Sequence, residues 1–295
     1  MLTVDDLISG FTLEPLGNGR FAAPNVDYYG SAGGGGAASA VADVIAGGQL
    51  LGQAIAAAAE VHPGKEAKTV HLIFARSGKV SEPLEVVADN THEGRSFGCV
   101  AIRFEQGGRT VCQGTVLTNV PDPDFIRHAR DLPARPGPDS GSVRIEDRGC
   151  YEVGVLPGAD DSLPDVGPAS LPMWVRFPGA PANPIIGQAL VAFATNFFLI
   201  GTAMRPHAGL SPNQSHLAMS TGVLSHTITF HEAIRAGDWL AIEQESPYAG
   251  SGRTYGRGDV FDQEGRLLAS YVQDGMIRSF GPAAASGHKG TGATL

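Results

Sequence analysis

Few residues of this sequence form a pattern that is known to support chemistry. Cys99, Cys112 and Cys150 are odd in number and lack metal-ligand spacing, which predicts reduced thiols and no metal site. Four successive glycines at 33–36 precede a helix-forming stretch but lack the Lys-Ser/Thr ending of a phosphate-binding loop. No Gly-x-Ser-x-Gly sequence indicates a serine hydrolase. The sequence therefore predicts no metal and no cofactor.

Polar residues in otherwise apolar stretches are the remaining candidates. Asn196 lies in an apolar run, and His71 and His226 lie in stretches rich in β-formers. A buried asparagine is more often a hydrogen-bonded structural group than a catalyst, and a strand histidine is usually structural too. His226 and His231 could link a strand to a helix. None of these residues indicates a function without a larger pattern around it.

The bulk composition predicts a folded protein of one large domain or two ordinary ones. The chain has 295 residues, of which 42% are hydrophobic and 17% are charged. Its net charge of −9 disfavours nucleic acid as a partner, because phosphate binding needs a basic face. The chain begins with acidic residues where a secretory signal would carry basic ones, so a cytoplasmic location is expected.

A repeated apolar helix organises the chain. The stretch 48–60 is rich in alanine and leucine, which predicts a helix that neighbours must cover. Its sequence Leu51-Gly-Gln-Ala-Ile55 returns as Ile186-Gly-Gln-Ala-Leu190. The second copy lies in an apolar run, 185–204, that is about long enough to cross a bilayer. Because it repeats the first helix, we interpret it as a buried helix and expect no membrane span.

Strands follow each helix in the same order, so an internal duplication of one α+β unit is predicted. Gly107-Gly108 and Glu264-Gly-Arg266 are hairpin signals at matching places. We expect one α+β unit at 1–122, a Pro/Gly-rich linker with short strands at 123–182, a second unit at 183–280 and a disordered tail at 281–295. A surface loop is favoured over a mobile flap for the glycine run. The predicted strands are 69–76, 84–88, 98–104, 110–118, 150–155, 173–177, 224–230, 239–243 and 267–273, and 252–256 echoes 94–98.

The ordered motifs resemble the acyl-CoA thioesterase II family over most of residues 5–280. This resemblance implies a double-hotdog fold, in which two helices are each wrapped by a curved antiparallel sheet. It also implies hydrolysis of fatty acyl-CoA in fatty-acid metabolism, without a metal or a covalent intermediate, and a homodimer or larger assembly. The motifs are 47–54, His71-x-x-Phe74-x-Arg76-x-Gly78, 94–97, His226-x-x-x-Phe230-His231, Gly252-Arg253, Gly256-Arg257-Gly258 and 272–278.

The family holds its water with an Asp, a Thr or Ser, and a Gln. These roles fall on Asn196, Val223 and Gln273, so two of the three positions depart from the pattern. A carboxamide cannot take a proton from water, although it can donate to an oxyanion, and valine cannot hydrogen-bond. Thr195 and Ser225 could substitute, because strand alternation would put Ser225 on the face of Val223.

The resemblance also gives His71 a second-rank place near the active site, because it aligns with a family histidine. Arg76, Arg205 and Arg253 could meet the phosphates of CoA, although an ordinary salt bridge is the simpler interpretation of each. Three functions stay open: hydrolysis of acyl-CoA, binding of acyl-CoA or an acyl chain without catalysis, and another reaction on an acyl thioester.

Overall fold

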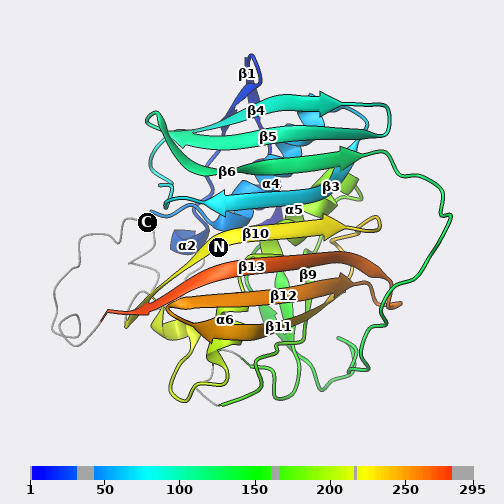
Figure 1. The fold of residues 1–295 in the computed structure, drawn as a ribbon. Coiled ribbons are helices and arrows are strands. Elements are labelled where there is room, and N and C mark those ends of the chain that lie inside the picture. The colour runs from blue at the N-terminus through cyan, green and yellow to red at the C-terminus, as the bar shows by residue number, and fades with distance from the viewer. Residues whose placement is uncertain (1, 32–42, 161, 163–165, 216–217, 281–295) are drawn as a thin grey trace.

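The computed structural model describes residues 2–31, 43–160, 162, 166–215 and 218–280. The predicted loop at 33–36 and the predicted disordered tail lie outside these residues. Within them, a long curved antiparallel sheet stands in front of a helical layer (Figure 1). The helices are α1 (Val4–Ser9), α2 (Tyr28–Ser31), α4 (Gly47–Val61), α5 (Pro184–Thr195), α6 (Leu199–Met204) and the 3₁₀ turn η1 (Pro212–Gln214).

The sheet formed by the described residues has 13 strands in the order β1-β2-β4-β5-β6-β3-β10-β13-β12-β11-β9-β8-β7. The predicted strands are present, and most extend beyond their predicted ends. The strands are β1 (Glu14–Gly17), β2 (Arg20–Ala23), β3 (Glu66–Phe74), β4 (Leu84–Glu93), β5 (Phe97–Gln106), β6 (Arg109–Asn119), β7 (Arg144–Asp147), β8 (Glu152–Val155), β9 (Met173–Arg176), β10 (Met219–Phe230), β11 (Leu240–Gly250), β12 (Arg253–Phe261) and β13 (Leu267–Ser279).

The strand order confirms the duplication. The first half runs β4-β5-β6-β3 and the second runs β10-β13-β12-β11, so equivalent strands mirror each other about the join. The join is the pairing of β3 with β10, in which Thr69–Ile73 lie opposite Ser225–Thr229. Both predicted hairpins connect paired strands, with left-handed glycines at 107, 108 and 265. The fold is the expected double hotdog.

The glutamine of the repeated Gly-Gln pair hydrogen-bonds to a backbone carbonyl outside its own helix in both halves. Buried Gln53 donates from α4 to the carbonyl oxygen of Pro24 at 2.8 Å. Buried Gln188 in α5 exchanges two hydrogen bonds with the backbone of Ala67, at 2.8 and 3.1 Å. Each glutamine therefore ties its apolar helix to a backbone segment that would otherwise lack partners.

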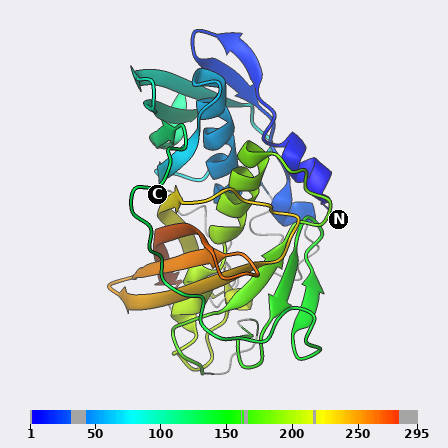
Figure 2. The same ribbon diagram turned by 90° about the vertical axis from the view of Figure 1, so that its right-hand side faces the viewer.

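Helices α4 and α5 lie side by side behind the sheet (Figure 2). Gly48 permits this contact, because a Cβ there would lie 2.6 Å from the carbonyl oxygen of Phe193. The glycine thus allows an approach of two backbones that any larger residue would prevent. The first half of the sheet covers α4, whereas α6 packs on β10 to β13.

The second helix is interrupted, which the sequence did not predict. We expected one helix over 184–203, but α5 ends at Thr195 and α6 begins at Leu199. Asn196 is the C-cap of α5, and it is a weaker helix former than its alanine neighbours. The stretch Pro184–Met204 is long and apolar enough to span a membrane, but 78% of its most apolar window is buried inside the protein. It is therefore a core segment.

The region predicted as a linker adds three strands to the sheet. β9 pairs with β11, β8 with β9 and β7 with β8, so this segment extends the sheet of the second half. Its strands agree with the predictions at 150–155 and 173–177, and β7 is an addition. Trp174 and Phe177 are buried here, which makes this region part of the core.

Candidate active site

The break between α5 and α6 places Asn196 beside the first turn of α4. Asn196 is only 4% exposed, and its Oδ1 lies 2.8 Å from where a Cβ on Gly47 would stand. Helix α4 begins there without a side-chain cap and without an acidic residue in its first turn. The positive end of the α4 dipole therefore lies next to the Asn196 carboxamide.

Thr195, His226 and Gln273 form one buried hydrogen-bonded series beside Asn196. Thr195 Oγ1 lies 3.3 Å from His226 Nε2, and His226 Nδ1 lies 3.1 Å from Gln273 Oε1. The imidazole is fully buried and stacks on the ring of Tyr271, with centroids 5.7 Å apart. His226 therefore joins the end of α5 to β13, which confirms the predicted strand-to-helix link. His231 instead contacts Ser270 on the neighbouring strand.

The contact of His226 Nδ1 with Gln273 Oε1 fits one tautomer of the ring. An amide oxygen can only accept, so the proton lies on Nδ1 and Nε2 is the acceptor nitrogen. Nε2 shares the Thr195 hydroxyl with the carbonyl oxygen of Ala192, which lies 3.2 Å from Thr195 Oγ1. The amide nitrogen of Gln273 then points away from the ring. Gln273 Nε2 and Asn196 Nδ2 are both buried, and neither has a hydrogen-bond partner among the described residues. Because buried polar groups are normally paired, each of these free donors indicates a place for an acceptor.

The buried imidazole should make the fold sensitive to acid. Burial lowers the pKa of His226 from 6.5 to about 4, and the hydrogen bond to Gln273 opposes this shift. The folded chain then binds fewer protons than the unfolded chain between these values. The contribution of His226 to the free energy of unfolding should therefore be fully present above pH 6.5, and the free energy should fall by about 3 kcal/mol as the pH drops to 4. Denaturant unfolding at pH 7 and pH 4.5 measures this loss.

Protonation of carboxylates also lowers the free energy of unfolding in acid. The control is therefore His226→Gln, which removes the imidazole. Its free energy of unfolding should fall less between the two pH values than that of the native chain. An equal loss in both proteins would contradict the assignment of the effect to His226.

A β-bulge separates Val223 from Ser225. Val223 lies opposite Gly275 and Ser225 lies opposite Asp274, so Leu224 is the extra residue. Ser225 therefore does not share the face of Val223, and the prediction from simple alternation is wrong. Its hydroxyl donates to Asp274 at 2.9 Å on the outer side of the sheet. Val223 lies directly opposite Gly275, so the two residues share one face of the sheet. A Cβ added at Gly275 would touch Ile200 of α6, which makes this the inner face.

His71 also lies on the outer face. Its neighbours Val70 and Leu72 are fully buried toward the helices, and alternation turns His71 the other way. Its Nδ1 lies 2.7 Å from Thr227 Oγ1 on the adjacent strand. The structure thus links Thr195 to Gln273 through His226, places Asn196 directly after Thr195, and separates His71 and Ser225 from this series.

The three arginines considered for CoA phosphates differ in their surroundings. Arg205 is buried and donates to the carbonyl oxygens of Gly158 and Pro168, which is a structural role without a salt bridge. Half-buried Arg253 donates to the carbonyl oxygen of Gly252. Arg76 is exposed at the end of β3 and makes no ion pair among the described residues. None of the three makes an ion pair among the described residues, and Arg76 is the exposed one of the three.

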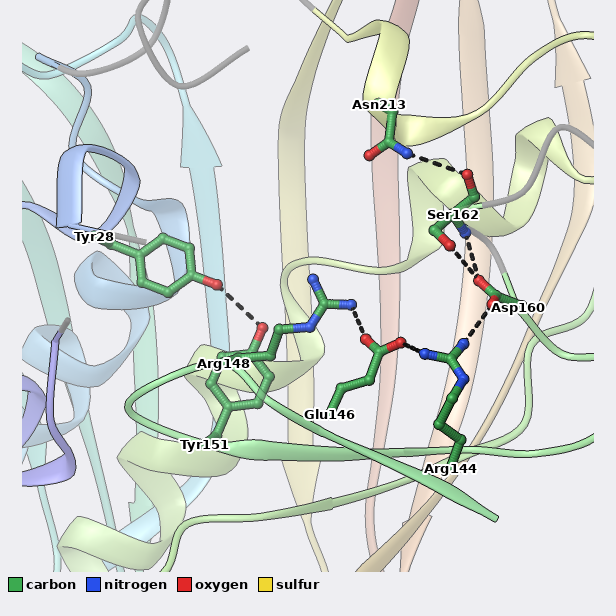
Figure 3. Close-up of polar contacts among 8 residues, drawn as sticks. All are labelled: Tyr28, Arg144, Glu146, Arg148, Tyr151, Asp160, Ser162 and Asn213. Atoms are coloured by element: carbon green, nitrogen blue, oxygen red, sulfur yellow. Dashed lines mark hydrogen bonds and ion pairs between the residues drawn. The ribbon is translucent and has the colours of Figure 1, made fainter. Parts of the chain in front are cut away.

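An aromatic cluster covers the same end of α5. The Tyr28 ring lies 5.2 Å from Phe193 and 4.8 Å from Phe197, and its hydroxyl lies 3.1 Å from that of Tyr151 (Figure 3). Burial raises the pKa of Tyr151 to about 12, so both phenols stay neutral. No local pattern in the sequence indicates this contact, because 123 residues separate the two tyrosines.

Charged residues of the β7–β8 hairpin surround this contact. Arg144, Glu146 and Arg148 form consecutive ion pairs, and Arg144 also pairs with Asp160 (Figure 3). The side chains of both arginines are about half exposed. The β7–β8 hairpin thus places the buried Tyr151 ring and a series of ion pairs near α2.

Comparison with known proteins agrees with this architecture. A family model described as "Acyl-CoA thioesterase C-terminal domain" matches residues 124–277, and one described as "Acyl-CoA thioesterase N-terminal domain" matches residues 36–119. Acyl-coenzyme A thioesterase 8 of Rattus norvegicus is 28% identical over 269 residues, which cover 79% of this chain and 80% of that protein. Acyl-CoA thioesterase 2 of Haemophilus influenzae is 26% identical, with 79% and 87% covered.

Among solved structures, the tesB protein of Mycobacterium avium subsp. paratuberculosis superposes with a TM-score of 0.77 and 23% identity. The match covers 93% of this chain and 99% of that one, and it supports the fold. Because the C-terminal family model alone matches more than half of the chain, the protein belongs to the acyl-CoA thioesterase family.

Proposed function

We propose that this protein hydrolyses acyl-CoA thioesters to free fatty acid and CoA by direct attack of water. The observation that carries the proposal is the pair of buried amide donors, Asn196 Nδ2 and Gln273 Nε2, which have no partner among the described residues. A thioester carbonyl is an acceptor, and its oxygen becomes more negative as water adds to the carbon. Donors that await this charge stabilise the transition state more than the ground state. The acyl-CoA thioesterase names of two relatives support this substrate class.

The same cluster explains why hydrolysis should be slow. An attacking water must lose a proton, and neither carboxamide can accept it. His226 is a poor substitute, because both of its ring nitrogens are engaged and burial lowers its pKa to about 4. The donors can contribute about a hundred- to a thousandfold. A general base, typically worth about a hundred- to ten-thousandfold, is missing.

Release of free thiol from acyl-CoAs of graded chain length tests this proposal. We expect release above the buffer rate at high enzyme concentration, in proportion to enzyme and with recovery of one free acid per thiol. A matched assay with an oxygen ester of the same acyl group checks that the thioester is preferred. Binding of acyl-CoA without any release would instead identify a binding protein that keeps the fold and has lost the base. No release and no binding would contradict both functions.

A further inference from the structure

Gln273 can place either end of its carboxamide toward the site. The two ends have nearly the same shape but opposite hydrogen-bonding character, since one donates and the other accepts. A donor facing a developing oxyanion stabilises it, whereas an amide oxygen in the same place repels it. Whatever fixes the orientation of this amide therefore determines whether the residue helps or opposes hydrolysis.

We propose that His226 is the positioning residue that turns the Gln273 amide nitrogen toward the substrate, an inference that rests on the hydrolysis proposed above. Its Nδ1–H lies 3.1 Å from Gln273 Oε1 and can be satisfied only by an acceptor. If the amide turned over, two N–H groups would face each other in a buried site. Leaving a buried donor unpaired costs about 1–3 kcal/mol, so the ring selects one orientation.

The other ring nitrogen of His226, Nε2, links the imidazole to the residue that precedes Asn196. Nε2 lies 3.3 Å from the hydroxyl oxygen of Thr195, the last residue of α5, and Asn196 follows directly as the C-cap of that helix. Stacking on Tyr271 and full burial hold the ring itself in place. One neutral imidazole thus sets the positions of both residues whose amide nitrogens lack partners.

Two substitutions of His226 separate positioning from packing. Asparagine can present an amide N–H at the place of Nδ1, so His226→Asn keeps the donor to Gln273 and loses the contact to Thr195. Glutamine reaches the place of Nε2, so His226→Gln keeps the contact to Thr195 and loses the donor to Gln273. Both variants lose the stacked ring, and asparagine leaves the larger cavity. A purely structural role therefore predicts that His226→Asn is the worse variant.

Positioning predicts the opposite order in catalysis. We expect His226→Gln to lower kcat about a hundredfold, the effect of losing one oxyanion donor, with KM little changed. His226→Asn should keep kcat within about tenfold of the native value even though it unfolds more readily. Steady-state kinetics and thermal unfolding of both variants give the comparison. Equal kcat values, or a lower kcat for His226→Asn, would overturn the proposal.

Nuclear magnetic resonance of the native protein gives a test that needs neither variant nor turnover. The ¹⁵N shifts of His226 should show a neutral ring with its proton on Nδ1 at pH 7. A non-hydrolysable thioether analogue of acyl-CoA should shift the side-chain NH₂ signals of Gln273 and leave the tautomer unchanged. A proton on Nε2 would overturn the proposal even if the protein is an active thioesterase. If the tautomer is correct but no thiol is released in the assay above, only the proposed hydrolysis fails.

Discussion

Replacing Asn196 with aspartate and Val223 with threonine together should raise the rate of acyl-CoA hydrolysis about a hundredfold. The aspartate supplies the base that the native cluster lacks but removes the Asn196 amide donor, so the net gain is smaller than a base alone would give. Threonine at 223, on the inner face, gives the water a further hydrogen-bond partner. We expect the aspartate alone to give about a tenfold gain and the threonine alone to give little, because both groups act on one water.

The structure supports a carboxylate at position 196. Its oxygen would lie at the uncapped start of α4, where the helix dipole favours negative charge. The new carboxylate should therefore stay ionised at neutral pH, and the gain should disappear in acid as it takes up a proton. Measurement of kcat against pH for the double variant tests this dependence.

Ser225→Ala is the matched control, because Ser225 lies outside the inner face and bonds to Asp274. This variant should keep the native rate. If the double variant folds, binds acyl-CoA and shows no rise in hydrolysis, the assignment of the water site to Asn196, Val223 and Gln273 is wrong.

Gln273→Ala should remove most of the native hydrolysis, a loss of about a hundredfold or more. The change deletes one of the two free donors and also leaves His226 Nδ1–H without its acceptor. We expect the free energy of unfolding to fall by about 1–3 kcal/mol as well, because that donor is buried. Thiol release and denaturant unfolding of the same preparation measure both effects.

Gln244→Ala is the matched control for Gln273→Ala. Gln244 is also a buried glutamine on the second half of the sheet, but both ends of its amide already have partners. Its Oε1 accepts from Tyr271 at 2.7 Å and its Nε2 donates to Thr202 at 2.8 Å. This variant should lose stability and keep most of its hydrolysis. Equal loss of hydrolysis in both variants would show that Gln273 acts only through the fold.

The sequence alone determined the fold to a large extent. The repeated Gly-Gln helix, the order of β-rich stretches and the two glycine hairpins are local patterns, and the structure contains each of them. The repeat also predicted that the two halves would share one sheet. These features follow from periodicity and turn chemistry, which depend on residues close together in the chain.

The arrangement of the site depended on contacts between distant residues. The break after Thr195 contradicts the apolar pattern around it, which predicted a continuous helix through this run. The bulge at Leu224 reversed the face of Ser225, since one added residue shifts the period-two alternation of a strand.

The polar contacts of the site join residues that the sequence keeps far apart. His226 meets Gln273 across 47 residues, and Tyr28 meets Tyr151 across 123. Hydrogen bonds of this kind leave no periodic signal, so only the tertiary structure shows which polar groups are paired. The tertiary structure also shows that the amide nitrogens of Asn196 and Gln273 have no partner within the part of the chain that it describes, because an unpaired donor is recognised only when its neighbours are known.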